Sequence, residues 1–295
     1  MKKFLILIPL YNDWKSAAKL LNEIDLQIEL WEAEVSIVIV NDASIEERSG
    51  LDFNYKNIKS VKILNMKQNQ VHQRCIAAGL KYISQNENFD RVFVMDADGE
   101  DRPEELNDFY KKAKENPNMT ITGNRFKRSE GLVFKILYEI HKLLTLIFTG
   151  KLIKFGNFTS LPKYHVEQLI QKPYLWNSYS SSVIKTIHER TSIPSIRGVR
   201  YVLPSKMNFI GLVFHSLAII SVFRNAVIFR SGIYLLVYLF LIFKSISLLN
   251  LIPIFLLLFF VIIMLKISTR SDKKGLDQSL DNISSIDTLK NSNNR

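Results

Sequence analysis

Four acidic side chains follow one short apolar stretch of this 295-residue chain. Residues 92–95 read Val-Phe-Val-Met, and the acids after them are Asp96, Asp98, Glu100 and Asp101. The apolar stretch predicts a buried strand, and Pro103 predicts the start of a helix beyond the acids. Carboxylates this close repel one another unless a cation lies among them, and Mg²⁺ or Mn²⁺ prefers such oxygen ligands. Asp96 and Asp98 are therefore candidate metal ligands; a solvated acidic turn that caps the helix is the alternative.

The elements that must position these acids alternate between strands and helices. Apolar stretches rich in β-branched residues predict strands, and apolar residues at helical spacing predict helices. The predicted strands cover residues 4–8, 35–40, 60–66, 92–95 and 119–122, and the predicted helices cover 14–30, 71–83 and a stretch from Pro103. This alternation predicts an α/β domain with a mostly parallel sheet and helices on both faces.

Asp42 follows the predicted strand 35–40, as Asp96 follows the strand 92–95. Ligands of open α/β sheets bind beyond the carboxyl ends of the strands, so both carboxylates could face one crevice. A turn or helix-capping role is the alternative for Asp42.

The composition is basic, with a formal net charge of +11 and ten Lys or Arg against three acids in residues 111–154. Such a face suits nucleic acid, anionic lipid or phosphorylated ligands. Cys75 is the only cysteine, which excludes a disulfide framework and a cysteine-based metal site. The chain has no Gly-x₄-Gly-Lys-Ser/Thr loop, so a P-loop nucleoside triphosphatase is not expected.

Two long apolar segments lie close together in the last third of the chain, at about 226–243 and 246–265. A membrane-spanning helix needs about 20 such residues, so these segments predict a transmembrane hairpin within 225–266. Lys and Arg residues flank both outer ends, which predicts that the flanks lie in the cytoplasm. A nucleic-acid binder is not expected to carry such a hairpin.

Segments next to the hairpin complete the predicted organisation. Residues 206–224 predict an interfacial helix, and the polar composition of 267–295 predicts a disordered cytoplasmic tail. The apolar stretch 132–148 is either a core helix or one lying in the membrane interface, and the Tyr- and Ser-rich stretch 174–182 predicts a loop.

Three motifs within residues 1–205, the predicted cytoplasmic domain, carry a family resemblance. Pro9-Leu-Tyr-Asn-Asp, Val40-Asn-Asp-Ala-Ser and Met95-Asp-Ala-Asp, in this order, resemble the nucleotide-sugar domain of family-2 glycosyltransferases, which has a GT-A fold. Asp101-Arg-Pro-Glu-Glu-Leu and Gly123-Asn-Arg-Phe-Lys-Arg resemble the polyprenyl-phosphate branch, which includes dolichol-phosphate mannosyltransferase. The resemblance extends over about residues 1–265.

This resemblance implies a role for each matching residue. The nucleoside would be held by Pro9, Tyr11, Asp13 and Asp42. A Mg²⁺ or Mn²⁺ ion that bridges the donor diphosphate would be held by Asp96, Asp98 and Glu100. Arg125 would approach phosphate oxygens, with which arginine makes paired hydrogen bonds. The acceptor phosphate would be held by Arg128, Arg197, Arg200 and Lys206.

Three positions depart from the family pattern. The family usually has Glu where Asp13 stands, often Gln where Glu100 stands, and often Asp where Asn157 stands. The last change removes a carboxylate and puts a sugar- or base-orienting role at that position in doubt. For Arg125 and Arg128, a solvated basic loop is the alternative.

The resemblance implies an inverting, membrane-bound glycosyltransferase that moves a sugar from a nucleotide-diphosphate donor to a polyprenyl phosphate. Its catalytic domain would face the cytoplasm, at a bacterial inner membrane. One alternative is a sugar hydroxyl as acceptor, although the Gln-x-x-Arg-Trp motif typical of such polysaccharide synthases is absent. The other alternative is a membrane-anchored relative without activity.

Overall fold

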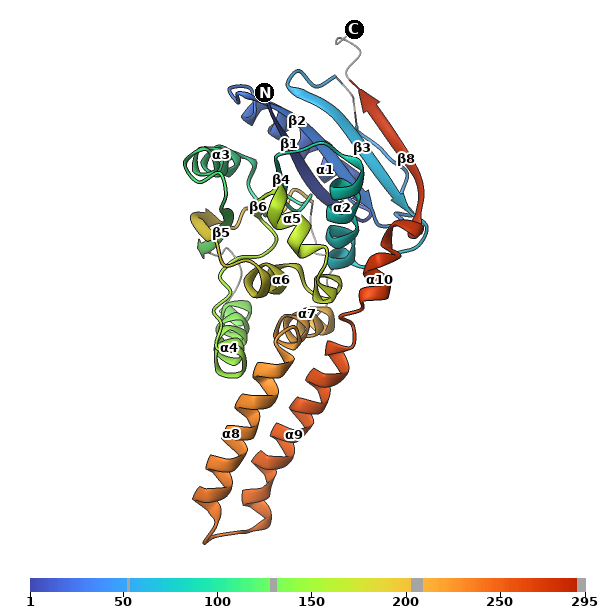
Figure 1. Ribbon diagram of the computed structural model, residues 1–295. Coiled ribbons are helices and arrows are strands. Elements are labelled where there is room, and N and C mark those ends of the chain that lie inside the picture. The colour runs from blue at the N-terminus through green and yellow to red at the C-terminus, as the bar shows by residue number, and fades with distance from the viewer. Residues whose placement is uncertain (52–53, 128–131, 203–208, 291–295) are drawn as a thin grey trace.

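The computed structural model describes residues 1–51, 54–127, 132–202 and 209–290. Within them, eight strands form one sheet in the order β7-β5-β6-β4-β1-β2-β3-β8 (Figure 1). The strands are β1 (Lys2–Leu10), β2 (Ala33–Asn41), β3 (Ile58–Met66), β4 (Arg91–Val94), β5 (Thr120–Lys127), β6 (Thr159–Pro162), β7 (Arg190–Ile196) and β8 (Ile283–Lys290). Strand β1 pairs in parallel with β2 and β4, whereas β6 and β8 run antiparallel to their neighbours. The predicted α/β class with a mostly parallel sheet is confirmed.

Helices cover both faces of the sheet, as predicted. The helical elements of the sheet domain are α1 (Trp14–Gln27), α2 (His72–Asn86), η1 (Pro103–Glu105), α3 (Leu106–Glu115), α5 (Lys163–Leu169), η2 (Pro173–Trp176) and α6 (Tyr179–Thr186). Helices α1 and α3 pack on one face and α2, α5 and α6 on the other, which gives two apolar cores.

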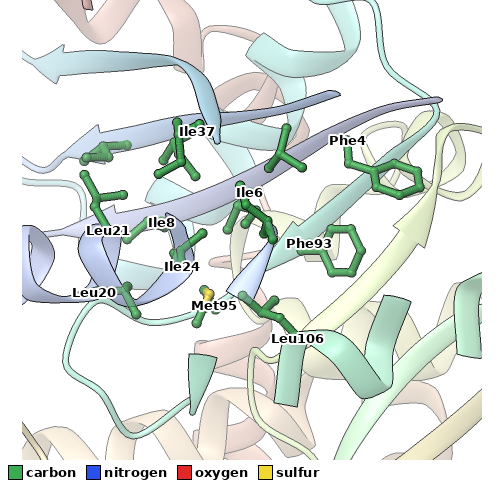
Figure 2. Close-up of a cluster of buried hydrophobic side chains, with 14 of the residues drawn as sticks. Phe4, Ile6, Ile8, Leu20, Leu21, Ile24, Ile37, Phe93, Met95 and Leu106 are labelled. Atoms are coloured by element: carbon green, nitrogen blue, oxygen red, sulfur yellow. The ribbon is translucent and has the colours of Figure 1, made fainter. Parts of the chain in front are cut away.

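Helix α1 shows how the sequence builds the first core. Its apolar residues recur at helical spacing, so Leu20, Leu21 and Ile24 lie on one face. That face packs against Ile6 and other side chains of the central strands (Figure 2). Because β1 is covered on both faces, it is apolar almost throughout. This packing fixes the carboxyl ends of β1, β2 and β4, where the polar loops begin.

The C-terminal hairpin projects away from the sheet as two antiparallel helices, α8 (Arg224–Ile242) and α9 (Leu248–Ser268) (Figure 1). Both are long and apolar enough to cross a membrane. Their apolar side chains are largely exposed; Phe240, for example, is 83% exposed. These bounds agree with the two predicted spans to within a few residues.

Helices α4 (Leu132–Thr149) and α7 (Phe209–Ser221) lie at the base of the hairpin. Phe148 of α4 packs with Ala218 of α7 and Met264 of α9 in a small apolar cluster. Ile140 and Leu143 of α4 remain exposed, so this helix is not a core helix of the sheet domain.

The predicted disordered tail is wrong for residues 273–290. Helix α10 (Lys273–Asp277) and the turn η3 (Ser279–Asn282) lead into β8, which pairs antiparallel with β3. Leu276 is fully buried in the second core, and the Lys81 ammonium donates to its carbonyl oxygen at 3.1 Å. Polar composition misled the prediction because β8 is stabilised by pairing with the edge of β3, a contact that composition does not reveal.

The predicted loop 174–182 is also wrong. Residues 173–176 form η2 and residues 179–186 form α6. The serine hydroxyls in this stretch are buried, and Ser182 Oγ donates to the carbonyl oxygen of Ser178 at 2.5 Å. Burial of Tyr179 in the second core overrides the weak helix propensity of this Ser-rich stretch.

Candidate active site

The acidic turn after β4 folds back on itself. The backbone N–H of Asp96 donates to Asp101 Oδ2 at 3.0 Å, and the N–H of Glu100 donates to Asp98 Oδ1 at 2.9 Å. Gly99 has a backbone φ of +84°, which residues other than glycine rarely adopt. The Tyr201 ring occupies the space that a β-carbon at this position would need. The turn therefore holds four carboxylates in a small volume at the carboxyl edge of the sheet.

Asp96 is held by two polar side chains, His72 of α2 and Asn157 of the segment before β6. His72 Nε2 lies 3.0 Å from Asp96 Oδ1, and Asn157 Nδ2 donates to both Asp96 oxygens at 3.0 and 3.3 Å. Burial by itself would raise the pKa of Asp96, but His72, Asn157 and the Arg125 charge hold it well below its usual range. Asp96 is therefore a fixed anion.

The pKa values of the neighbouring carboxyl groups, Asp98 and Asp101, are raised rather than lowered. Burial, reinforced by the negative charges of Asp96 and Glu100, raises the pKa of Asp98 to about 6. Burial and the charge of Asp96 raise the pKa of Asp101 to about 7. These carboxylates carry more negative charge than their surroundings stabilise, which is the condition that favours binding of a cation.

Three arginines supply positive charge around the turn. Arg125 Nη2 lies 2.9 Å from Asp101 Oδ1, and both side chains are buried. Arg200 Nη1 lies 2.7 Å from Asp98 Oδ2 and 3.6 Å from Glu100 Oε1. Arg197 Nη2 lies 2.5 Å from Glu100 Oε2.

The segment that carries Arg197 and Arg200 lies along the acidic turn. The backbone N–H of Gly198 donates to the carbonyl oxygen of Glu100 at 2.9 Å, and the N–H of Tyr201 donates to that of Asp98 at 2.8 Å. A β-carbon at Gly198 would approach the Gly99 carbonyl oxygen to 2.3 Å, so only glycine allows this contact. The segment around Gly198 therefore lies directly over the acidic turn.

The loops after β1 and β2 form a second polar region beside the turn. The backbone N–H of Asn12 donates to Ser44 Oγ at 2.8 Å, and Asn12 Oδ1 accepts from the N–H of Ile45 at 2.8 Å. Asn12 has a φ of +50°. The bonds hold Tyr11, which is 41% exposed, at the rim of the site.

The carboxylate of Asp42 has a structural role. Its Oδ1 accepts from the N–H of Gln70 at 2.6 Å and its Oδ2 accepts from the N–H of Val71 at 3.0 Å. Val71 has a φ of +74°, which is rare for a β-branched residue and costs about 1–3 kcal/mol. Asp42 thus stabilises the strained turn that places His72 at the start of α2.

Comparison with known proteins identifies the domain. A family model described as glycosyl transferase family 2 matches residues 5–176, more than half of the chain. The chain belongs to glycosyl transferase family 2. A search of curated proteins by sequence found no significant match.

Solved structures share the fold at low sequence identity. Mannosyl-3-phosphoglycerate synthase from Rubrobacter xylanophilus has 14% identity and a TM-score of 0.55, over 78% of this chain and 74% of that one. Residues 1–349 of TarS from S. aureus have 14% identity and a TM-score of 0.51, over 96% and 89%. Glucosyl-3-phosphoglycerate synthase from Mycobacterium tuberculosis, solved with Mn²⁺, uridine diphosphate and glucosyl-3-phosphoglycerate, has 10% identity and a TM-score of 0.53, over 78% and 80%. The glycosyltransferase therefore has the GT-A fold.

The structure brings most of the predicted site residues of this glycosyltransferase together. Arg200 Nη2 lies 4.0 Å from Asp13 Oδ2, so the loop after β1 meets the acidic turn through this arginine. Pro9 lies inside β1, paired with Val40. Arg128 and Lys206 lie outside the described residues.

For three of the predicted roles, the residues contact groups other than the predicted ligands. The predicted acceptor ligands Arg197 and Arg200 contact the carboxylates of the acidic turn. Arg125, expected at phosphate oxygens, is buried against Asp101, and Asp42 is bonded to backbone as the capping alternative proposed.

Sequence reasoning did not assign His72 or Asp101. Asp101 is one of the four acids of the turn, but only its buried pairing with Arg125 distinguishes it from its neighbours. His72 comes from a helix that follows β3, and its approach to Asp96 depends on the strained turn at Val71. The sequence did contain one signal for His72: a histidine at the start of a helix that follows the carboxyl end of a strand.

The donor set of this glycosyltransferase fits a hard divalent cation in its chemistry, because crowded carboxylates with raised pKa values favour one. Among the described residues, however, no group of three or more His, Cys, Asp or Glu side chains is arranged to hold a metal ion. The guanidinium of Arg200 contacts Asp98 directly. Metal binding therefore requires Arg200 to move off this carboxylate.

Proposed function

We propose that this glycosyltransferase transfers a sugar from a nucleotide-diphosphate donor to a polyprenyl phosphate at a membrane surface. The observation that carries the proposal is the position of the apolar hairpin. Helices α8 and α9 project away from the sheet domain with α7 at their base (Figure 1), and His215 of α7 lies within electrostatic reach of Asp96. A lipid acceptor would therefore reach the site without leaving the membrane.

The loops after β1 and β2 would receive the nucleoside. Tyr11 is exposed at their rim, and Asp13 lies between this region and the acidic turn. A divalent ion held by Asp96, Asp98 and Glu100 would neutralise charge on the leaving nucleoside diphosphate. Arg197 and Arg200, once displaced from Asp98 and Glu100, are positioned to contact the diphosphate oxygens.

Arg125 stabilises the acidic turn from a buried position. Its guanidinium is buried against Asp101 and its charge acts on Asp96 as well. We infer that it compensates the carboxylates and keeps the turn in place. A direct contact with substrate phosphate would require it to leave Asp101.

The acceptor would attack the anomeric carbon from the face opposite the leaving group, with inversion. A phosphate monoester has a second pKa near ~6 and is largely ionised at neutral pH. Such a nucleophile needs no protein base, unlike a sugar hydroxyl.

The surfaces around the hairpin support a position at the membrane. Apolar side chains of α4 are exposed next to it, and the helix ends that face the sheet domain carry Arg224 and Lys266. Because basic flanks stay on the cytoplasmic side, the catalytic domain is proposed to lie there.

A transfer assay tests the proposed function. Membranes that contain the protein are offered labelled nucleotide sugars, with and without added polyprenyl phosphate, and the label that enters the organic phase is measured. We expect one donor to label the lipid only when the phosphate is present. Equal labelling of free polyprenol or of a free sugar would refute the phosphate acceptor.

A sugar hydroxyl is the second candidate acceptor, and one observation favours it. His72 Nε2 lies 3.0 Å from Asp96 Oδ1, where its imidazole would take a proton from an attacking hydroxyl once it has lost the proton that the Asp96 charge stabilises. Under this mechanism His72→Gln would abolish transfer, whereas a phosphate acceptor would still react. Assaying His72→Gln with both acceptors separates the two functions.

A further inference from the structure

The two loops beside the acidic turn both contain backbone that their side chains do not favour. Ala43, in the loop after β2, has a φ of +56°, and Asn12, in the loop after β1, has a φ of +50°. Such left-handed backbone is uncommon for residues other than glycine and persists only where surrounding contacts hold it. The contacts that hold these loops therefore determine the shape of the region proposed to receive the nucleoside.

Asn41, the last residue of β2, holds the start of the second loop. Its Oδ1 accepts from the backbone N–H of Ser44 at 3.1 Å. Ser44 Oγ in turn accepts from the N–H of Asn12 at 2.8 Å. The side chain of Asn41 therefore connects the sheet to both loops.

A row of polar side chains continues from Asn41 to the edge of the sheet, where β8 lies beside β3 (Figure 1). Asn41 pairs in register with Asn65 of β3, which pairs with Ser285 of β8. Asn41 Nδ2 donates to Asn65 Oδ1 at 2.9 Å. Asn65 Nδ2 donates to Ser285 Oγ at 3.0 Å and to Asp287 Oδ2 at 3.3 Å. One continuous chain of hydrogen bonds thus runs from Asp287 to Asn12.

Asp287 also contacts the loop after β2 directly. Arg48 Nη1 lies 2.9 Å from Asp287 Oδ2. The side chains of this ion pair are 39% and 41% exposed, so the pair contributes little by itself. Combined with the amide row, it holds the loop at two points, Asn41 and Arg48. Strand β8 therefore acts on both ends of the loop through one carboxylate.

We propose that Asp287 and Asn65 are positioning residues for the nucleotide donor. They act through Asn41 and Ser44, and they hold residues 42–48 in the shape that the nucleoside requires. The proposal rests on the proposed function, because it assigns the nucleoside to the loops after β1 and β2. A strand that follows the membrane hairpin thereby sets the affinity of a site formed near the start of the chain.

The expected effect is on donor affinity and not on the chemical step. A loop already held in its binding shape loses less conformational freedom when the ligand binds. Without the row, the loop has several shapes, and the affinity falls with the fraction that is competent to bind. The acidic turn is held by separate contacts with Arg125 and Arg200, so turnover at saturating donor should not change.

Binding is measured by calorimetry on the full chain in nanodiscs, with uridine diphosphate and guanosine diphosphate as probes in the presence of Mn²⁺. Asp287→Ala and Asn65→Ala are each expected to weaken nucleotide binding about fivefold, the loss expected for one hydrogen bond. Thr288→Ala is the matched control, because Thr288 is an exposed residue of the same strand on the opposite face. It is expected to stay within about twofold of the parent.

Enzyme kinetics separate positioning from a merely structural role. Both alanine variants are expected to raise the donor KM about fivefold and to leave kcat and the KM for polyprenyl phosphate unchanged. Asp287→Asn keeps an acceptor oxygen for Asn65 and is expected to fall between the parent and Asp287→Ala. Amide hydrogen exchange of residues 41–48 should become faster in both alanine variants, with the exchange of α3 unchanged.

Each outcome decides the proposal. Unchanged nucleotide affinity in both alanine variants would overturn it, even if transfer to polyprenyl phosphate is normal. A fall in kcat as large as the rise in donor KM would also overturn it, because β8 would then only stabilise the domain. Weaker nucleotide binding in both variants, in a protein that does not glycosylate polyprenyl phosphate, would support the positioning role and refute the proposed acceptor.

Discussion

Asp98 shows how one side chain can take part in two states of the site. Its carboxylate contacts Arg200 at 2.7 Å, and its pKa is raised to about 6 by burial and by Asp96 and Glu100. The same negative charge is needed by a metal ion and by the arginine that covers it. Exchange between these two partners would couple donor binding to the opening of the segment around Arg200.

The first prediction concerns this carboxylate. Asp98→Asn should lower turnover about 10²–10³-fold, because the uncharged amide is a poor ligand for a divalent ion. The thermal unfolding temperature should change little or rise, since the repulsion from Asp96 is removed. Glu104→Gln, an exposed acid outside the cluster, is the control and should keep full turnover. Near-normal turnover of Asp98→Asn in the presence of chelator would contradict the metal assignment.

A second prediction concerns His165, which is fully buried, with its Nδ1 2.8 Å from Thr120 Oγ1. Burial lowers the pKa of His165 below its usual value of about 6.5. The unfolded chain therefore binds the proton first, so the stability is complete above about pH 6.5 and is lost as the pH falls below it. The loss is at most about 1.4 kcal/mol per pH unit for one proton.

Chemical denaturation at pH 7.5 and at pH 5.5 measures this effect. His165→Gln keeps a polar partner for Thr120 and should flatten the pH dependence of the free energy of unfolding. His188→Gln, which changes a histidine outside this core, is the control. An equal slope in His165→Gln and in the parent would show that another group binds the proton.

At the residue scale, the sequence placed the acids directly after a buried strand, where the structure has them, but it did not predict which side chains contact them. Asp96 and Asp98 could be assigned because they follow a buried strand at close spacing. The positions of His72 and Arg200 depend on a strained turn at Val71 and on a glycine contact at Gly198, neither of which a periodicity reveals. Contacts between loops that are distant in sequence are set by tertiary structure.

Among the elements, the C-terminal segment after the hairpin determines how far the sheet domain extends. Strand β8 pairs with β3, and α10 packs against η2 and α2. The catalytic domain is therefore built from both ends of the chain.

Leu276 of α10 tests this arrangement in a third prediction. It is fully buried, so Leu276→Ala should lower the free energy of unfolding by about 2–4 kcal/mol through lost apolar contacts and a cavity. Ile286→Ala changes a residue of β8 that is 43% exposed and should cost under about 1 kcal/mol. Denaturant titration of the purified protein measures both. Equal, small effects would mean that residues 273–290 do not contribute to the core.

Elements with a strong apolar pattern were predicted to within a few residues. Burial on both faces makes the central strands apolar, and the two hairpin helices are apolar along almost their whole length. Strand β8 and helix α6 were not predicted. Each is a short polar segment stabilised by a partner, the β3 edge for one and the second core for the other. Local composition carries no information about such partners.

For the whole molecule, the strand after the hairpin belongs to the same sheet as the strands before it. This constrains how the chain can lie across a membrane and gives a fourth prediction. Reporters placed before Met1 and after Arg295 should lie on the same side of the membrane, because β8 and β1 belong to one sheet. From the basic flanks we expect that side to be the cytoplasm. Protease protection or a cysteine-labelling assay on intact cells measures this. Reporters on opposite sides would mean that only one apolar helix spans.

The pairing of β3 with β8 also sets an order of events during synthesis. Strand β3 leaves the ribosome early, whereas its partner emerges only after α8 and α9 have been made. Until then the β3 edge is unpaired and open to wrong partners. The sheet of the catalytic domain is therefore completed only after both helices of the hairpin have been synthesised. A chain that stops before residues 283–290 would keep an open sheet edge, a feature that promotes wrong pairing and aggregation.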